Sequence, residues 1–388
     1  MKLALATLLV LASPVHADPV RLRADALATT ASPAGLLVLE SEGAMEPGLS
    51  AEAVVWVAGM REPEREATGD VLVIAVRARD PHGRGNAQLG RFVAMLGALR
   101  PTHVDGLSGR VHLPKRFDVE AFAGVPVLAS SVDASRSWDW IAGGRVARRL
   151  GDYGSAGIAY LQRRDGGRLA SEELGGDVGF AINARDDVGG RLAYDLANPG
   201  VAEASLSASR RTKVWRAEVY ARHRAASHLL PATSLFSVLG DVPSQRAGAV
   251  VTWRAAPRLD VIGDVAARRV DDDLDAEVLV RARLRLDERG KSSVAGELRR
   301  IGGTSGWTGA RGMAQVAVSP RVTLSSEIEL VVPDDDRGRG VVWPWALVAA
   351  SWKQGPWDSA IAVEASASPE YRHRVDGLVQ LSRRWSVP

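Results

Sequence analysis

The feature that most constrains the fold is a strict two-residue alternation from Leu274 to Asp287, LDAEVLVRARLRLD. One alternate set is wholly apolar and consists of Ala276, Val278, Val280, Ala282, Leu284 and Leu286. The other set is almost wholly charged and consists of Asp275, Glu277, Leu279, Arg281, Arg283 and Arg285. Because successive side chains of a strand point to opposite faces, the segment predicts a strand with one apolar and one charged face.

The length of this segment distinguishes between two kinds of β-protein. It is longer than the usual soluble strand of about 5–6 residues. It suits the roughly 9–11 residues that a tilted strand needs to cross a bilayer. The same alternation recurs in residues 117–127, 322–332 and 357–363. The sequence therefore predicts an all-β fold, a closed antiparallel transmembrane β-barrel with lipid outside and a charged lumen inside.

Candidate strands with a period of two occur along most of the chain. We expect about 18, within a range of roughly 16 to 22 and even in number. From the C-terminus backwards they are 373–386, 357–367, 342–353, 322–332, 307–318, 292–300, 274–287, 258–269, 246–255, 213–224, 201–210, 188–196, 174–183, 153–163, 138–149, 117–127, 107–113 and 87–95. We therefore assign residues 87–388 to the barrel.

The links between these strands alternate between short turns and longer loops. Outer-membrane barrels have short periplasmic turns and longer extracellular loops, so this sorting favours a membrane barrel over a soluble sandwich. Residues 18–86 are less regular, with candidate strands near residues 20–26, 35–41, 49–58 and 70–80. This N-terminal β-region contains either the first strands of the barrel or a small periplasmic segment.

The first residues have the pattern of a secretory signal peptide. Lys2 is followed by an apolar run from Leu3 to Leu11, and Val15-His16-Ala17 has the small-x-small form of a cleavage site. We expect residues 1–17 to be removed after Ala17 and the mature chain to reach the outer membrane of a Gram-negative bacterium. The chain has no cysteine, so a disulfide framework is excluded.

Tryptophan is frequent and occurs near the ends of the predicted strands. Trp215, Trp253, Trp357 and Trp385 lie beside predicted short turns, whereas Trp138, Trp307 and Trp343 lie at the opposite strand ends. Amphipathic aromatic rings collect at both interfaces of membrane proteins. The positions predict two aromatic girdles, although tryptophan is also a common residue of strands and cores.

Together these features resemble Gram-negative outer-membrane β-barrels of the porin type. The final strand adds to the resemblance, because Val375, Gly377, Val379, Leu381 and Trp385 continue the alternation. In that family the last strand normally ends in an aromatic residue, whereas this chain continues to Val387-Pro388. The resemblance implies a passive pore or an export conduit and indicates no particular substrate.

The charged faces supply the candidate functional residues. The expected pore-lining residues are Arg145, Arg216, Arg222, Arg254, Glu277, Arg281, Arg283, Arg285, Glu327 and Glu329. Rings of charged side chains give pores their selectivity, and a slight excess of arginine predicts a weak preference for anions. The alternative is that a water-filled barrel needs polar walls, whose opposite charges simply pair with one another.

The longest link is unusually apolar for a solvated loop. It contains Leu229, Leu230, Leu235, Phe236 and Leu239 within residues 227–244. A cluster of apolar side chains in a loop is usually buried against another surface. We expect this link to fold inward as a constriction, unless it docks a partner or simply packs against the inner wall.

No catalytic motif is present, and we expect neither an enzyme nor a cofactor or metal site. The pattern also leaves open a non-conducting outer-membrane docking component and a soluble secreted β-protein. The least favoured hypothesis is a barrel-embedded hydrolase that uses residues such as His223 and Ser234. The expected partners are outer-membrane lipid and lipopolysaccharide, together with periplasmic or envelope-machinery proteins. The net charge of +3 is too small to predict nucleic-acid binding.

Overall fold

The computed structural model describes residues 20–29, 34–60, 68–127, 139–225, 243–270, 273–303, 306–334, 341–367 and 373–387. The strands in these ranges form a single antiparallel sheet of 22 strands. The expected all-β antiparallel fold is therefore confirmed. No helix in the described part of the chain is long and apolar enough to cross a membrane. The expected signal peptide, residues 1–17, lies outside the described residues.

The strands are numbered in chain order. Their bounds are β1 (Val20–Thr29), β2 (Ala34–Glu46), β3 (Leu49–Met60), β4 (Thr68–Arg79), β5 (Gly85–Ala94), β6 (Thr102–Leu113), β7 (Phe117–Pro126), β8 (Trp140–Leu150), β9 (Gly154–Asp165), β10 (Arg168–Ala181), β11 (Asp186–Asp195), β12 (Gly200–Arg211), β13 (Trp215–Arg224), β14 (Ser244–Ala256), β15 (Leu259–Val270), β16 (Asp273–Arg285), β17 (Ser293–Ile301), β18 (Trp307–Ala317), β19 (Val322–Pro333), β20 (Trp343–Gln354), β21 (Trp357–Ser366) and β22 (Arg374–Val387). One 3-10 turn, η1 (Pro114–Arg116), separates β6 from β7.

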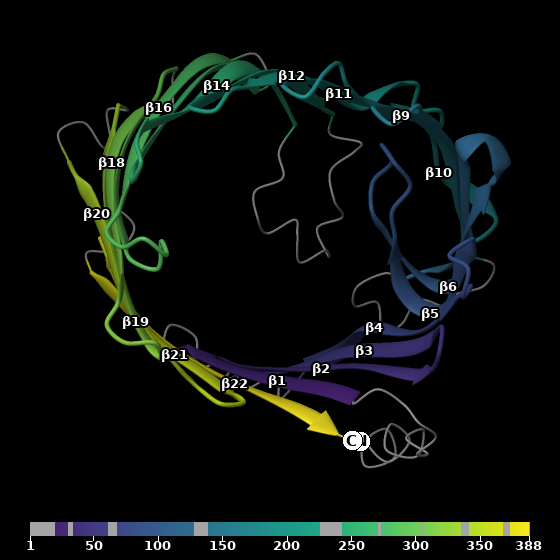
Figure 1. Ribbon diagram of the computed structural model, residues 1–388, viewed down its shortest axis with the longest axis horizontal. Coiled ribbons are helices and arrows are strands. Elements are labelled where there is room, and N and C mark those ends of the chain that lie inside the picture. Colours follow the sequence, from purple (N-terminus) through teal and green to yellow (C-terminus); the bar gives the residue numbers. More distant parts are fainter. Residues whose placement is uncertain are drawn as a thin grey trace.

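The sheet forms a ring. Each strand pairs with its neighbours in sequence, and β22 pairs with both β21 and β1. The closing register places Val20 opposite Val387 and Thr29 opposite Leu378. Figure 1 shows the ring, with the purple β1 beside the yellow β22. Because the described strands have partners on both sides, the sheet presents no free edge.

The expected number of about 18 strands is wrong. The structure has 22 because the N-terminal region contributes β1–β4 to the same sheet. A chain of this length accommodates 22 strands because many of its links are short. Several links are in fact minimal: only Pro47-Gly48 joins β2 to β3, and only Pro257-Arg258 joins β14 to β15.

The apolar and charged sets of β16 occupy opposite faces of the sheet, as the alternation predicts. Leu274, Val280 and Leu284 are 72%, 49% and 42% exposed, whereas Glu277 is 6% exposed. The apolar set is paired with apolar neighbours, for example Val278 with Val265. Glu277 of the charged set borders a cavity shared by eight consecutive strands, and such a cavity lies on the concave side of a curved sheet. The outer face of β16 is therefore apolar and its inner face polar.

The links divide between two rims of the ring. The short-turn rim consists of the links that follow even-numbered strands, and these are residues 47–48, 80–84, 114–116, 151–153, 182–185, 212–214, 257–258, 286–292, 318–321 and 355–356. The opposite rim contains the longer links, including 95–101, 127–139, 225–243, 334–342 and 367–373. Sorting by length holds in general, although residues 166–167 make a short turn on the opposite rim.

The expectation of two tryptophan girdles agrees with the structure at the short-turn rim, whereas at the opposite rim Trp307 and Trp343 do not face outward. At the short-turn rim, Trp215 pairs with Trp253 on the outer face, where an interfacial ring belongs. At the opposite rim, Trp307 and Trp343 lie on the inner face, in register with Ile301 and Val331 respectively. Both residues have odd numbers, and the odd-numbered residues of β18 and β20 face the inside of the ring. Trp138 lies outside the described residues.

Candidate functional site

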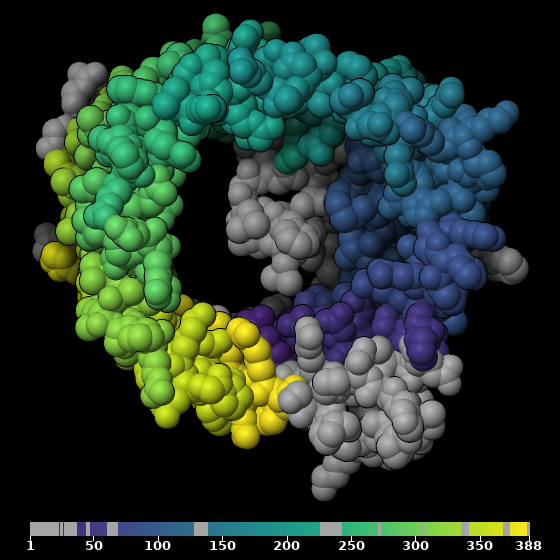
Figure 2. All heavy atoms as spheres, in the orientation of Figure 1, coloured from purple at the N-terminus to yellow at the C-terminus, as the bar shows by residue number. Residues whose placement is uncertain are grey.

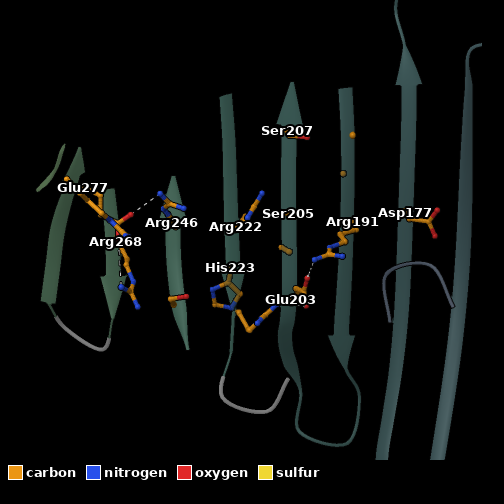
Figure 3. A pocket seen from close by; sticks show the side chains of 16 residues that line it. Asp177, Arg191, Glu203, Ser205, Ser207, Arg222, His223, Arg246, Arg268 and Glu277 are labelled. Carbon is orange, nitrogen blue, oxygen red and sulfur yellow. Dashed lines mark ion pairs between the residues drawn. The ribbon is translucent and has the colours of Figure 1, made fainter. Parts of the chain in front are cut away.

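A cavity with a volume of about 810 Å³ lies on the inner face of β10–β17. Figure 3 shows its side chains projecting from neighbouring strands toward one space. Six arginines border it: Arg191, Arg222, Arg224, Arg246, Arg268 and Arg299. The bordering carboxylates are fewer, namely Asp177, Glu203 and Glu277. Each carboxylate carries one negative charge at neutral pH, so the lining has an excess of three positive charges.

Two buried glutamates organise part of this lining. The Glu277 side chain is 7% exposed and lies 2.8 Å from Arg246 and 3.8 Å from Arg268. The Glu203 side chain is 11% exposed and forms ion pairs with Arg191 and Arg224. Charge-assisted hydrogen bonds of this kind fix guanidinium groups in place. The paired arginines therefore form a preorganised wall.

Arg222 and Arg299 differ from the rest of the cavity arginines. No carboxylate of the described residues lies within ion-pair distance of either one. Instead, the Arg222 guanidinium lies 5.3 Å from the centre of the Tyr220 ring, and that of Arg299 lies 5.3 Å from the centre of the Trp307 ring. An aromatic face attracts a cation without neutralising it. These two groups keep their positive charge available to an anion in the cavity.

A second feature of the inner face is the link between β5 and β6, residues 95–101, which we call the inner strap. Leu96, Ala98 and Leu99 are 5%, 4% and 4% exposed. Leu96 and Leu99 belong to a buried apolar cluster that also contains Phe92, Ala94, Val104, Phe122, Ile141, Ala159, Leu161, Ala193 and Ala202. The cluster members lie on the inner faces of their strands. The strap thus packs against the inside of the wall, and Figure 1 shows this blue part of the chain turning into the ring.

Small residues on the wall make room for the strap. A Cβ added to Gly143 would lie 2.8 Å from the Cδ1 of Leu96, and a Cβ added to Gly175 would lie 2.8 Å from the Cδ2 of Leu99. Gly97 has a φ of +55° and lies so close to Arg145 that an added Cβ would be 2.7 Å from its Nε. Both a left-handed backbone and a close approach require glycine at this position.

Ion pairs fix both the strap and the wall beneath it. Arg100 of the strap lies 3.0 Å from Glu173, whose side chain is 3% exposed. Beneath Gly97, Arg145 donates two hydrogen bonds to Asp177, of 3.0 Å from Nε and 2.6 Å from Nη2. Removing one partner of a buried ion pair costs roughly 3–5 kcal/mol. The strap is therefore an anchored element and not a free loop.

The residues predicted to line the passage all lie on the inner face. Arg222 and Glu277 border the cavity. Arg145 lies beneath the strap with a side chain that is 14% exposed, so it does not reach open space. Ion pairs engage most of the remaining residues, and these pairs are Arg216–Glu218, Arg254–Asp260, Arg285–Asp260, Arg281–Glu297 and Arg311–Glu327. Arg283 and Glu329 have no ion pair among the described residues.

Sequence reasoning missed most of the cavity and the whole strap. The expected constriction residues Leu229, Leu230, Leu235, Phe236 and Leu239 lie outside the described residues. The described segment that enters the barrel is instead 95–101. Its sequence, MLGALRP, is as apolar as the longer link, and inward glycines stand opposite it on β8–β10. An apolar link facing a run of inward glycines was the available signal.

Comparisons with known structures support the barrel fold. No protein-family model matches the sequence, and no curated protein matches it significantly. The structure of the P pilus usher (PapC) translocation pore is similar, with a TM-score of 0.53 and 9% identity over 96% of this chain and 100% of that chain. PapC in an E. coli P pilus tip assembly intermediate also has a TM-score of 0.53 and 9% identity, over 95% of this chain.

The present chain spans 61% of that PapC molecule. A Pseudomonas aeruginosa OccK5 (OpdH) structure matches with a TM-score of 0.43 and 9% identity over 96% of this chain and 98% of that one. At this level of identity, the likeness to PapC shows the fold.

Proposed function

We propose that the protein is an outer-membrane β-barrel that acts as a passive pore or export conduit for polar solutes or polymer, with a preference for anions. The observation that carries the proposal is the division of faces in one ring of strands. The outer face is apolar along the length of a strand such as β16, and the inner face holds an arginine-rich cavity. Lipid is the suitable surrounding for the apolar outer face, and water is the suitable surrounding for the charged inner face. Figure 2 shows an opening inside the ring, bordered by its green part.

Lipid contact is tested by placing a charge on the outer face at two depths. Val280 lies midway along β16, and Leu274 lies near its end. We expect Val280→Arg to lower the free energy of unfolding from vesicles by about 2–4 kcal/mol, and Leu274→Arg to lower it by about 0–1 kcal/mol. The measurement is denaturant-induced unfolding from phosphatidylcholine vesicles. Equal effects at both positions would contradict a bilayer around the barrel, because a soluble surface has no such depth dependence.

The pore itself is tested by conductance across a planar bilayer. We expect the full-length protein to produce discrete current steps and, in a KCl gradient, a reversal potential that favours Cl⁻ over K⁺. The preference follows from the excess of arginine in the cavity. Detergent added without protein provides the baseline. A preference for K⁺ would contradict the proposed anion preference, but it would not contradict the proposed pore.

A second candidate is a non-conducting component that docks further envelope proteins. The strap favours this alternative, since it already fills part of the space inside the barrel. The P pilus tip assembly intermediate PapC-PapD-PapK-PapG gives an example of a similar fold in a complex with other proteins. Complete absence of current steps from correctly inserted protein would favour the docking component over the pore.

A further inference from the structure

All the lysines of the chain after residue 2 lie at the short-turn rim. They are Lys115, Lys213, Lys291 and Lys353, and each one is exposed. Lys115, Lys213 and Lys291 are in links, and Lys353 is the second-last residue of β20. These four positions are spread along the chain from β6 to β20 and share one rim.

Arginines extend the same pattern. Exposed arginines occupy further links of the short-turn rim, at Arg84, Arg116, Arg185, Arg258, Arg289 and Arg321. Only two of these have an ion pair among the described residues, Arg116 with Asp152 and Arg258 with Glu288. Most of the guanidinium charge on this rim is therefore available.

Carboxylates near the lysines offset little of their charge. The Asp287 carboxylate accepts the backbone N–H groups of Lys291 and Ser292, and the Lys291 side chain has no ion pair among the described residues. Lys353 lies 3.9 Å from Asp358, and exposed pairs at such a distance are weak in water. Lys115 and Lys213 have no ion pair among the described residues. The rim keeps a clear excess of free cations.

The opposite rim differs. In the described residues of its links, the only lysine or arginine is Arg100, which is paired with Glu173 inside the barrel. Asp139 and Asp334 also lie in those links. Among the described link residues, the cations are therefore concentrated at the short-turn rim.

Aromatic rings lie on the outer face near the same rim. Outward Trp residues near the short-turn rim are Trp215, Trp253, Trp352, Trp357 and Trp385. Arg383 lies between two of these rings, 4.7 Å from Trp357 and 4.9 Å from Trp385. Trp rings with flanking Lys and Arg are typical of the headgroup layer of a bilayer, where the ring contacts acyl chains and the cation contacts phosphate.

We propose that the short-turn rim is a collar that binds the phosphates of anionic phospholipids in the adjacent leaflet. The partner is a lipid surface and not an acidic protein, because the cations are distributed around the circumference and are accompanied by outward aromatic rings. A protein partner would require a patch on one side. The collar fixes which end of the barrel faces the anionic leaflet. This inference rests on the membrane location proposed above.

The test is partition of detergent-solubilised protein into vesicles of phosphatidylcholine alone or with phosphatidylglycerol. We expect phosphatidylglycerol to raise partition of the wild-type protein by about tenfold or more, since cations near an anionic membrane surface are attracted to it. The combined variant K115Q/K213Q/K291Q/K353Q should lose most of this increase. The matched Lys→Arg variant should keep it, and a high salt concentration should abolish it for the wild type.

The control removes the same charge from the opposite end of the barrel, through R164Q, R168Q, R269Q and R374Q together. This variant should retain the effect of phosphatidylglycerol. The lipid assignment is overturned if the Lys→Gln variant responds like the wild type, or if the control loses the response equally. Conductance of the Lys→Gln variant in phosphatidylcholine bilayers separates the two proposals: current steps there would leave the pore standing even when the collar fails.

Discussion

Replacement of the inner strap, residues 95–101, by Asn-Gly is expected to raise the single-channel conductance. The replacement is compatible with the barrel because Ala94 already pairs with Thr102, so a two-residue turn can close the hairpin directly. Ionic current through a water-filled barrel increases with its open cross-section. Removing a segment that packs on the inner face of β7–β10 widens that section. Planar-bilayer recording measures the change.

A full-length variant separates the volume of the strap from its docking. Leu96→Ala with Leu99→Ala should weaken docking strongly, because truncating a buried leucine costs roughly 2–5 kcal/mol. We expect the current to fluctuate between two levels as the strap leaves and rejoins the wall. Met95 belongs to the same segment and is 69% exposed, so Met95→Ser should keep the wild-type trace. Unchanged conductance in the shortened variant would mean that the strap does not border the conducting path.

The alternation of apolar and polar residues made most of the fold predictable. In β16 the face of every side chain followed from its position, because a period of two leaves no freedom once one face must meet an apolar solvent. The strand number was not predictable from the same signal. β1–β4 alternate less regularly, and their membership of the sheet depends on pairing between β1 and β22, residues from the two ends of the chain.

The sequence predicted on which face of the sheet each site residue lies, but not which residues lie close together. Arg222 and Glu277 were expected on the inner face, and they lie there. Which inward charges border one cavity depends on how registers shift between strands, as at the bulge between Ala193 and Tyr194. Arg145 illustrates the limit: it faces inward as expected, but the strap covers it. Such coverage is a long-range contact that no local pattern encodes.

Reversing two charges in the cavity is expected to reverse the ion preference of the pore. Arg222 and Arg299 are the arginines of the cavity whose charge no carboxylate of the described residues offsets, so their replacement breaks no ion pair there. Arg222→Glu with Arg299→Glu changes the lining from an excess of three positive charges to an excess of one negative charge. A pore selects ions by the field of the side chains that line it. The reversal potential in a KCl gradient should therefore move from favouring Cl⁻ to favouring K⁺.

The matched control places the same change of charge on the short-turn rim, through Lys213→Glu with Arg321→Glu. Exposed charges act over roughly 8–10 Å at physiological salt, so rim residues influence the cavity less than residues that border it. The control should keep the preference for Cl⁻. If both double variants shift the reversal potential equally, the net charge of the protein sets selectivity. If only the cavity variant shifts it, permeating anions pass the arginines of β13 and β17.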